Sequence, residues 1–286
     1  MICAALALCV PCAFVCNYGI SPAFASVSET NDYVVVESVK LPIVMYHDVM
    51  KASKGRYIVS PAQLESDVSA LLDAGYTFVS PREVILYAEG KAALPEKPVM
   101  LTFDDGHYNN AYYGLPVFEK YDAKATFCVV GEYADRYSES VKSERDNPNY
   151  SCLTWDEISE LAKGRLVNFA SHSYDMHALK GRHGIMPKSG ESDEAYVAAL
   201  KTDTEKLQTR MEMFAGGRSE VYAYPFGLYT PLSRQTLEDL GYKMFLTCNE
   251  HVSTVRYGDT DSIKELGRFN REGAYSTDKI MRKLTK

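Results

Sequence analysis

The sequence predicts an α/β fold in which parallel strands form a distorted or incomplete (β/α) barrel of seven to eight strands. Short apolar runs of strand length alternate with helix-forming segments along most of the chain, a pattern typical of repeated strand–helix units. Seven or eight such units are enough to curl a parallel sheet toward a barrel. A doubly wound open sheet is the alternative, but no Gly-x-Gly-x-x-Gly segment follows any expected strand.

The expected strands are short runs of apolar residues that end at polar residues or glycine. The first expected strand, over residues 34–39, is an edge strand. The strand over residues 98–103, before Asp104, is expected to be central. The predicted strands cover residues 34–39, 41–48, 76–79, 98–103, 125–130, 166–170, 221–224, 243–247 and 263–266.

The expected helices are marked by their start signals. Ser60-Pro61 and Ser80-Pro81 each combine an N-cap residue with a first-turn proline, and Thr154 to Glu157 forms a capping box. The predicted helices cover residues 61–74, 81–90, 110–120, 154–163, a long amphipathic stretch through 196–214, 231–240 and 277–284. Residues 132–152 and 180–190 are expected to be polar loops.

The N-terminal part of the chain differs in composition from the rest. Residues 1–25 contain no charged side chain, and Ala23 to Ala25 offer the small residues of a cleavage site. We therefore expect a signal peptide or N-terminal anchor over 1–25, a stalk and edge strand over 26–39, and one catalytic domain over 40–286. Export to the cell surface or medium follows, with membrane contact only through the N-terminal segment if it is uncleaved. The formal net charge of −7 argues against nucleic acid as a partner.

Two adjacent carboxylates, Asp104 and Asp105, follow the expected central strand and precede Gly106. Ordinary turn chemistry explains such a triplet, since Asp and Gly favour turns. The other interpretation is catalytic, because strand ends of a parallel barrel carry the active site. Neighbouring acids can then divide the work, one ligating a metal and the other handling a proton.

His172 and His177 follow another expected strand, five residues apart. On a helix this spacing would turn them about 140° apart, so a loop or tight turn would have to bring them together. Two imidazoles and one carboxylate leave an open position on zinc for water, as in catalytic sites. The alternative is two surface histidines that are neighbours by chance.

Four segments together resemble a known family. Thr102–Gly106 resembles the first motif of the polysaccharide deacetylases (the NodB-homology group, carbohydrate esterase family four), and Ser171–His177 resembles the second. Ala223–Gly227 resembles the third motif. The five-residue His spacing and Pro42–His47 are similar to the branch that de-N-acetylates poly-β-1,6-N-acetylglucosamine. The resemblance covers roughly residues 41–270, with the motifs in the expected order.

The resemblance implies a role for each motif residue. Asp104 would be the general base, and Asp105, His172 and His177 would hold a divalent metal, for which zinc is expected. The backbone N–H of Phe226 would help to hold the oxyanion. The residues expected to contact the substrate are Tyr224, Pro225, Phe226 and Arg268.

Two departures from the family pattern affect these roles. Tyr222 and Ala223 stand where an arginine commonly precedes the third-motif proline, and Arg268 is expected to replace it. The late histidine that serves many members as general acid is absent, so we assign the acid to His47, with His107 as the alternative. The aromatic side chains expected either to stack on sugar rings or to belong to the core are Trp155, Tyr222, Tyr224 and Phe226.

The function that follows is removal of N-acetyl groups from N-acetylglucosamine polymers by a secreted, metal-dependent hydrolase. Its partner would be an acetylated amino-sugar polysaccharide. Peptidoglycan or acetylxylan could be the substrate of the same chemistry. A carbohydrate-binding protein on a catalytically weak scaffold is the alternative from another class.

Overall fold

The computed structural model describes residues 34–51, 55–140 and 147–285. The predicted signal peptide or anchor at 1–25 and the predicted stalk up to residue 33 lie outside these ranges. The described residues belong to one compact unit.

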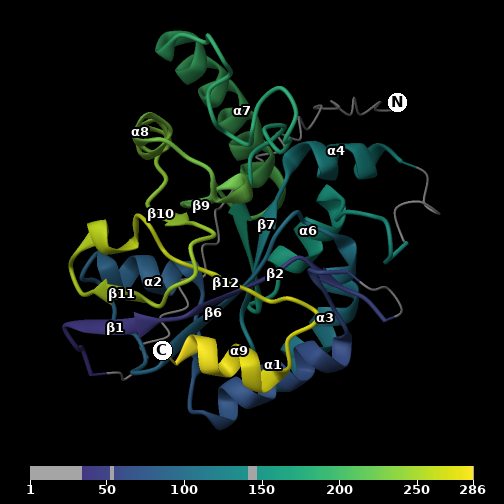
Figure 1. The fold of residues 1–286 in the computed structure, drawn as a ribbon, viewed down its shortest axis with the longest axis vertical. Coiled ribbons are helices and arrows are strands. Elements are labelled where there is room, and N and C mark those ends of the chain that lie inside the picture. The colour runs from purple at the N-terminus through teal and green to yellow at the C-terminus, as the bar shows by residue number, and fades with distance from the viewer. Residues whose placement is uncertain (1–33, 52–54, 141–146, 286) are drawn as a thin grey trace, which may run out of the picture. The chain divides into compact units, whose positions relative to one another are not determined.

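A curled parallel sheet occupies the centre of this unit (Figure 1). Seven strands pair one after another in the order β10-β9-β8-β7-β6-β2-β12, and β5 pairs with β6 beside this path. Within the described residues no ladder joins β10 to β12, so the sheet is an incomplete barrel. The predicted fold class is confirmed. The strands are β2 (Ile43–Tyr46), β5 (Thr77–Phe78), β6 (Pro98–Phe103), β7 (Ala125–Val129), β8 (Val167–Ser171), β9 (Val221–Ala223), β10 (Met244–Leu246) and β12 (Phe269–Asn270).

Two small sheets lie outside the barrel. β1 (Ser38–Leu41) pairs antiparallel with β11 (Ser253–Arg256), and β3 (Asp48–Val49) pairs in parallel with β4 (Ile58–Val59). The edge strand expected over 34–39 therefore begins later, at Ser38, and β11 was not expected.

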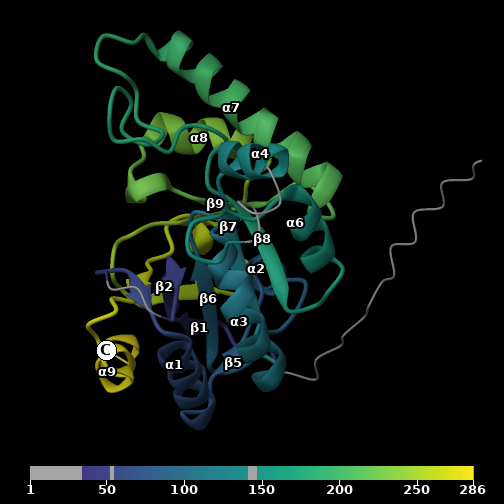
Figure 2. The same ribbon diagram turned by 90° about the vertical axis from the view of Figure 1, so that its right-hand side faces the viewer.

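Helices surround the sheet (Figures 1 and 2). Capping boxes at Ser60, Ser80 and Thr154 start three of them as predicted, and Thr230 starts another. In both views α7 lies beside α8 at one end of the unit, and α1 lies beside α9 at the other. The helices are α1 (Pro61–Asp73), α2 (Pro81–Ala88), α3 (Tyr108–Tyr121), α4 (Gly131–Glu139), α6 (Trp155–Ala162), α7 (Asp193–Phe214), α8 (Pro231–Asp239) and α9 (Thr277–Leu284), with 3-10 turns η1 (Pro225–Gly227) and η2 (Thr260–Ile263). None of the helices in the described ranges is both long and apolar enough to cross a membrane.

Two expected elements were wrong. The polar loop expected over 132–152 contains α4, which the sequence conceals because Val130 provides no side-chain cap and only Gly131 and Ala134 are buried. The strand expected over 263–266 is reduced to a single parallel bridge between Leu266 and Leu246, and Ile263 is the last residue of η2. There the Asp259 side chain accepts a hydrogen bond from the N–H of Asp261, a local bond that favours a turn over a strand.

A buried ion pair attaches the C-terminal segment to α1. Arg271 is fully buried, and its Nε and Nη2 donate to the Asp67 carboxylate at 2.6 and 3.1 Å. The hydroxyls of Tyr46 and Thr277 donate to the same carboxylate at 3.0 and 2.7 Å. The network joins β2, α1, the segment after β12 and the first residue of α9.

We predict that Asp67→Ala lowers the free energy of unfolding by about 3–5 kcal/mol, because Arg271 would keep a buried charge without its partner. Urea denaturation followed by circular dichroism measures the change. Glu65→Ala is the matched control, since Glu65 lies on the same helix in a surface pair with Lys120 and should leave the midpoint unchanged. An equally stable Asp67→Ala variant would contradict the role assigned to the network.

Candidate active site

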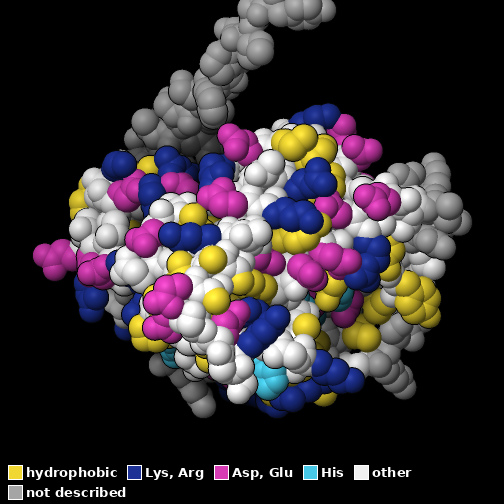
Figure 3. Space-filling view, turned by 90° about the horizontal axis from the view of Figure 1, so that it is seen from above, with side chains coloured by type: hydrophobic (Ala, Val, Ile, Leu, Met, Phe, Trp, Pro, Cys, Tyr) yellow, Lys and Arg dark blue, Asp and Glu magenta, His cyan; other side chains and the backbone are white. Residues whose placement is uncertain are grey.

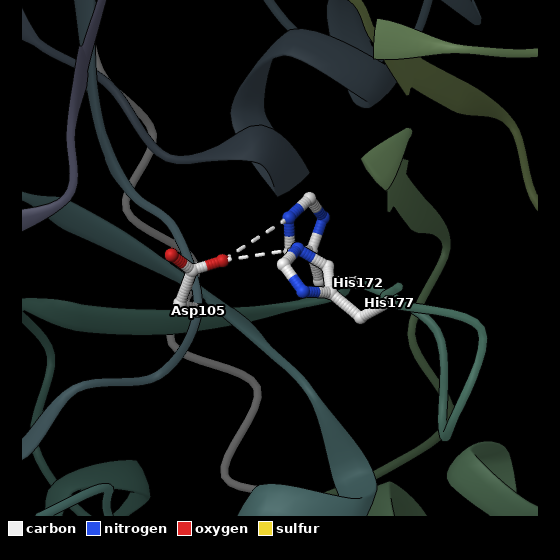
Figure 4. Close-up of side chains that lie close together, drawn as sticks. All are labelled: Asp105, His172 and His177. Atoms are coloured by element: carbon white, nitrogen blue, oxygen red, sulfur yellow. Dashed lines mark ion pairs between the residues drawn. The ribbon is translucent and has the colours of Figure 1, made fainter. Parts of the chain in front are cut away.

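The polar side chains that follow β6, β8 and β9 come together at one end of the sheet. Asp104 and Asp105 follow β6, His172 follows β8, and His177 lies in the loop beyond it (Figure 4). The sheet is parallel, so these strand ends share one edge, which explains how residues 72 positions apart can meet.

Backbone strain concentrates at this edge. Four non-glycine residues in the described ranges have a positive φ, and three of them lie here: Asp105 (69°), Ser173 (70°) and Phe226 (58°). Such conformations are costly for residues with a side chain and are typical of functional sites. The fourth residue, Asp122, ends helix α3, where a left-handed residue is ordinary.

Asp105, His172 and His177 form a group that could hold a metal ion. Their ligand atoms all lie within 4.8 Å of one another. Asp105 Oδ1 is 3.2 Å from His177 Nε2 and 3.6 Å from His172 Nε2 (Figure 4). Donor atoms bound to one tetrahedral zinc at about 2.0–2.1 Å would lie about 3.3 Å apart, so the group fits a single divalent ion.

The surroundings of His172 prepare it for metal binding. Its Nδ1 lies 2.8 Å from the carbonyl oxygen of Ala223, which can only accept, so Nδ1 carries the proton and Nε2 keeps a free lone pair. Burial lowers the pKa of His172 to about 4, so the ring is neutral near pH 7. A neutral imidazole is the form that ligates a metal.

The two carboxylates have different partners. Burial raises the pKa of Asp105, but the hydrogen-bond contact with His177 outweighs burial and holds that pKa well below its usual value. For Asp104, burial again opposes ionisation, and the charge of Arg268 together with its hydrogen bond holds the pKa below the usual value. Both groups are therefore carboxylates at neutral pH.

Arg268 lies directly against Asp104. Its Nη1 donates to Asp104 Oδ1 at 2.6 Å, and its Nε donates to the carbonyl of Thr247 at 2.9 Å. We expected Arg268 to contact the polysaccharide. Its side chain has no exposed surface, so this expectation is wrong. The placement instead matches the other expectation, that Arg268 replaces the arginine missing before Pro225.

The two candidate acids, His47 and His107, lie on either side of Asp48. His47 follows β2 as Asp104 follows β6, and these two strands are paired up to Tyr46 and Phe103. Its ring stacks on Tyr57 at 4.9 Å between centroids. His107 Nδ1 lies 2.9 Å from Asp48 Oδ1, and although burial opposes it, this contact raises the pKa of His107 to about 9.

The third-motif segment forms η1 after β9. Phe226 is 38% exposed, and its ring centroid lies 4.8 Å from that of His177. Gly227 has φ 70°, and a Cβ there would come within 2.7 Å of the Cys248 side chain, so only glycine fits. Pro225 and Tyr224 are buried, and Tyr224 stacks on Tyr229 and Phe245. Sugar stacking on the rings of Tyr224, Tyr222 and Trp155 is therefore wrong, because all three belong to the core.

Sequence reasoning missed Tyr133. Its hydroxyl lies 3.4 Å from His177 Nδ1, and the two rings meet edge to face at 5.9 Å. Tyr133 lies on α4, the helix that the sequence concealed. The only signal in the sequence was the four-residue spacing of Tyr133 and Tyr137, which would put both side chains on one face of a helix.

Comparison with known proteins agrees with this geometry. Residues 91–245 match the family model described as polysaccharide deacetylase, which is more than half of the chain. The chain belongs to the polysaccharide deacetylase family. The matched region contains both carboxylates, both histidines and the third-motif turn.

Relatives of this polysaccharide deacetylase include YxkH of Bacillus subtilis, a protein named for the family. It is 28% identical over 77% of this chain and 68% of its own length. The poly-β-1,6-N-acetyl-D-glucosamine N-deacetylase of Escherichia coli K12 is 28% identical over 76% of this chain, which spans only 35% of that protein. Among solved structures, a de-N-acetylase from Aggregatibacter actinomycetemcomitans shares the fold, with a TM-score of 0.73 and 21% identity over 85% of this chain and 99% of that one.

We predict that His172→Ala weakens zinc binding at least about 100-fold, because even the loss of a partner behind a ligand costs about 10- to 100-fold. Competition with a fluorescent zinc chelator measures the affinity. His183→Ala is the matched control, since His183 lies in the 180–190 loop outside the metal-ligand group, and its affinity should equal that of the natural protein. Equal zinc binding by His172→Ala would remove it from the ligand set.

Proposed function

We propose that this polysaccharide deacetylase is a secreted, metal-dependent hydrolase that removes N-acetyl groups from polymers of N-acetylglucosamine. Poly-β-1,6-N-acetylglucosamine is the substrate we favour, since the Escherichia coli relative is named for that activity. The observation that carries the proposal is the meeting of Asp105, His172 and His177 beside the buried carboxylate of Asp104.

The resident metal would be a divalent ion, with zinc expected, held by Asp105, His172 and His177. When bound, such an ion polarises the acetamide carbonyl and lowers the pKa of the attacking water. The carbonyl of Ala223 keeps His172 in the tautomer that offers Nε2.

Asp104 is the proposed general base. Its Oδ2 lies 4.0 Å from His172 Nε2, so it borders the metal group without belonging to it. Arg268 donates a hydrogen bond to Asp104 Oδ1, which orients the carboxylate. Oδ2 is then left to accept a proton from water. In this role Arg268 is a positioning residue rather than a substrate contact.

The turn at Pro225–Gly227 is the proposed oxyanion site. Phe226 has a left-handed backbone conformation and lies between a proline and a glycine, so the direction of its N–H is fixed. Fixed hydrogen-bond donors stabilise the developing negative charge better than mobile ones. The exposed ring of Phe226 would contact the sugar beside His177.

His47 is the proposed general acid that protonates the leaving amine. It follows β2 where Asp104 follows the paired strand β6, and it is half-buried. His107 is less suited to the role, because its Nδ1 is engaged by Asp48.

Export remains part of the proposal. The uncharged segment at 1–25 would direct the chain to the cell surface or medium, and any membrane contact would pass through that segment. The face drawn in Figure 3 carries interspersed basic and acidic side chains rather than a large area of one sign. Such a surface suits a neutral polysaccharide better than nucleic acid.

Acetate release is the direct test of the proposal. The zinc-loaded protein should release acetate from poly-β-1,6-N-acetylglucosamine faster than from peptidoglycan or acetylxylan, as measured by an enzyme-coupled acetate assay. Asp104→Asn should keep its zinc and lose about 10²- to 10⁴-fold in kcat, because an amide cannot accept the proton from water. Faster release from either rival polymer would reassign the substrate. Binding of the polymer without acetate release from any of the three would favour a carbohydrate-binding protein.

We predict that His47→Gln lowers kcat at least about tenfold, keeps zinc and flattens the alkaline limb of the pH profile, since glutamine cannot protonate the amine. Steady-state kinetics from pH 5 to 10 supply the profile, and zinc content is measured alongside. An unchanged kcat with a raised KM would make His47 a substrate contact instead.

A further inference from the structure

A cavity adjoins the candidate active site. It has a volume of about 600 Å³ and lies between α4, the segment after β2 and the residues before α6. This volume is within the range of small-molecule sites. The residues that concern its chemistry are Asp48, His107, Tyr133, Arg136, Tyr137 and Tyr150.

Two residues connect the cavity to the metal group. Tyr133 lines the cavity while its hydroxyl lies 3.4 Å from His177 Nδ1. His107 also lines it and follows Asp105 by two residues. The cavity therefore lies beside the metal group and shares its boundary with residues that contact or adjoin the ligands.

The cavity lining is aromatic and polar at once. Tyr133, Tyr137 and Tyr150 contribute rings, and Asn149 contributes an amide. The Tyr150 residue is 80% exposed, an unusual position for a large ring in a folded domain. Its backbone is nevertheless fixed, because the Tyr137 hydroxyl donates to the Tyr150 carbonyl at 2.5 Å and the Tyr150 N–H donates to the Asn147 carbonyl at 3.2 Å.

The charges that line the cavity are already paired. Asp48 lies 2.9 Å from His107, and Arg136 lies 2.6 Å from Glu132 on the same helix. Asp48 also accepts a hydrogen bond from the Asn109 side-chain amide at 2.8 Å, so the carboxylate and the guanidinium of this lining are both engaged by neighbouring side chains. The cavity consequently favours a neutral ligand with an apolar face and many hydroxyls, the properties of an acetylated sugar.

We propose that this cavity binds a neutral N-acetylhexosamine residue that adjoins, along the polymer, the residue being deacetylated, with the ring of Tyr150 stacking on its apolar face. This inference rests on the proposed function, because it takes the polymer as the ligand. It assigns a binding role to α4 and to the segment that precedes α6.

Calorimetric titration with a β-1,6-linked N-acetylglucosamine pentamer tests the proposal. The zinc-loaded Asp104→Asn protein is the background, so that the ligand is not consumed. Adding Tyr150→Ala should raise the Kd about threefold to tenfold, the size expected for one ring contact. Tyr150→Phe should bind like the background, because it keeps the ring.

Tyr112→Ala is the matched control, since Tyr112 is 52% exposed on α3 and outside the cavity, and it should leave the Kd unchanged. A Kd that Tyr150→Ala does not alter, or no pentamer binding at all, would overturn the cavity assignment. Failure of the proposed function gives a different result: the natural protein would release no acetate while Tyr150 still governed pentamer binding.

Discussion

The contact between Arg268 and Asp104 is the interaction on which the rest of the site depends. Two adjacent carboxylates in a buried site would ordinarily share a proton, because each raises the pKa of the other. Arg268 is fully buried against one oxygen of Asp104, while the two imidazoles face Asp105. The pair is thereby separated into one carboxylate proposed to accept a proton and one proposed to ligate a metal.

Sheet topology and strained backbone conformations together position the residues of the site. The parallel register delivers Asp104, His172 and the third-motif turn to one edge of the sheet, and the left-handed residues then direct the chain at that edge. Strain of this kind persists only when the surrounding structure holds it. The buried β6, with every residue inaccessible, is the rigid element that bears Asp104 and Asp105.

Much of this was predictable because its signals are local. N-cap signals at Ser60, Ser80 and Thr154 located three helices, and apolar runs located most strands. The Asp-Asp-Gly segment and the five-residue His spacing selected the residues that the structure brings together. What failed depended on long-range packing. Arg268 is not the expected substrate contact because it is fully buried against Asp104, 164 residues away, and the burial of the Tyr222 and Tyr224 rings depends on neighbouring strands and helices. Helix α4 has neither a side-chain cap nor an apolar stripe, so its sequence did not predict a helix. The position of Tyr133 beside His177 was therefore not predicted.

The central claim is that one divalent ion on Asp105, His172 and His177 makes the chain a deacetylase. Titrating zinc into the chelator-treated protein while following acetate release from the N-acetylglucosamine polymer tests it most directly. The account predicts negligible release without metal, a linear rise with added zinc and a plateau at one equivalent per chain. Full activity in the metal-free protein, or no activity at any zinc concentration, would contradict it.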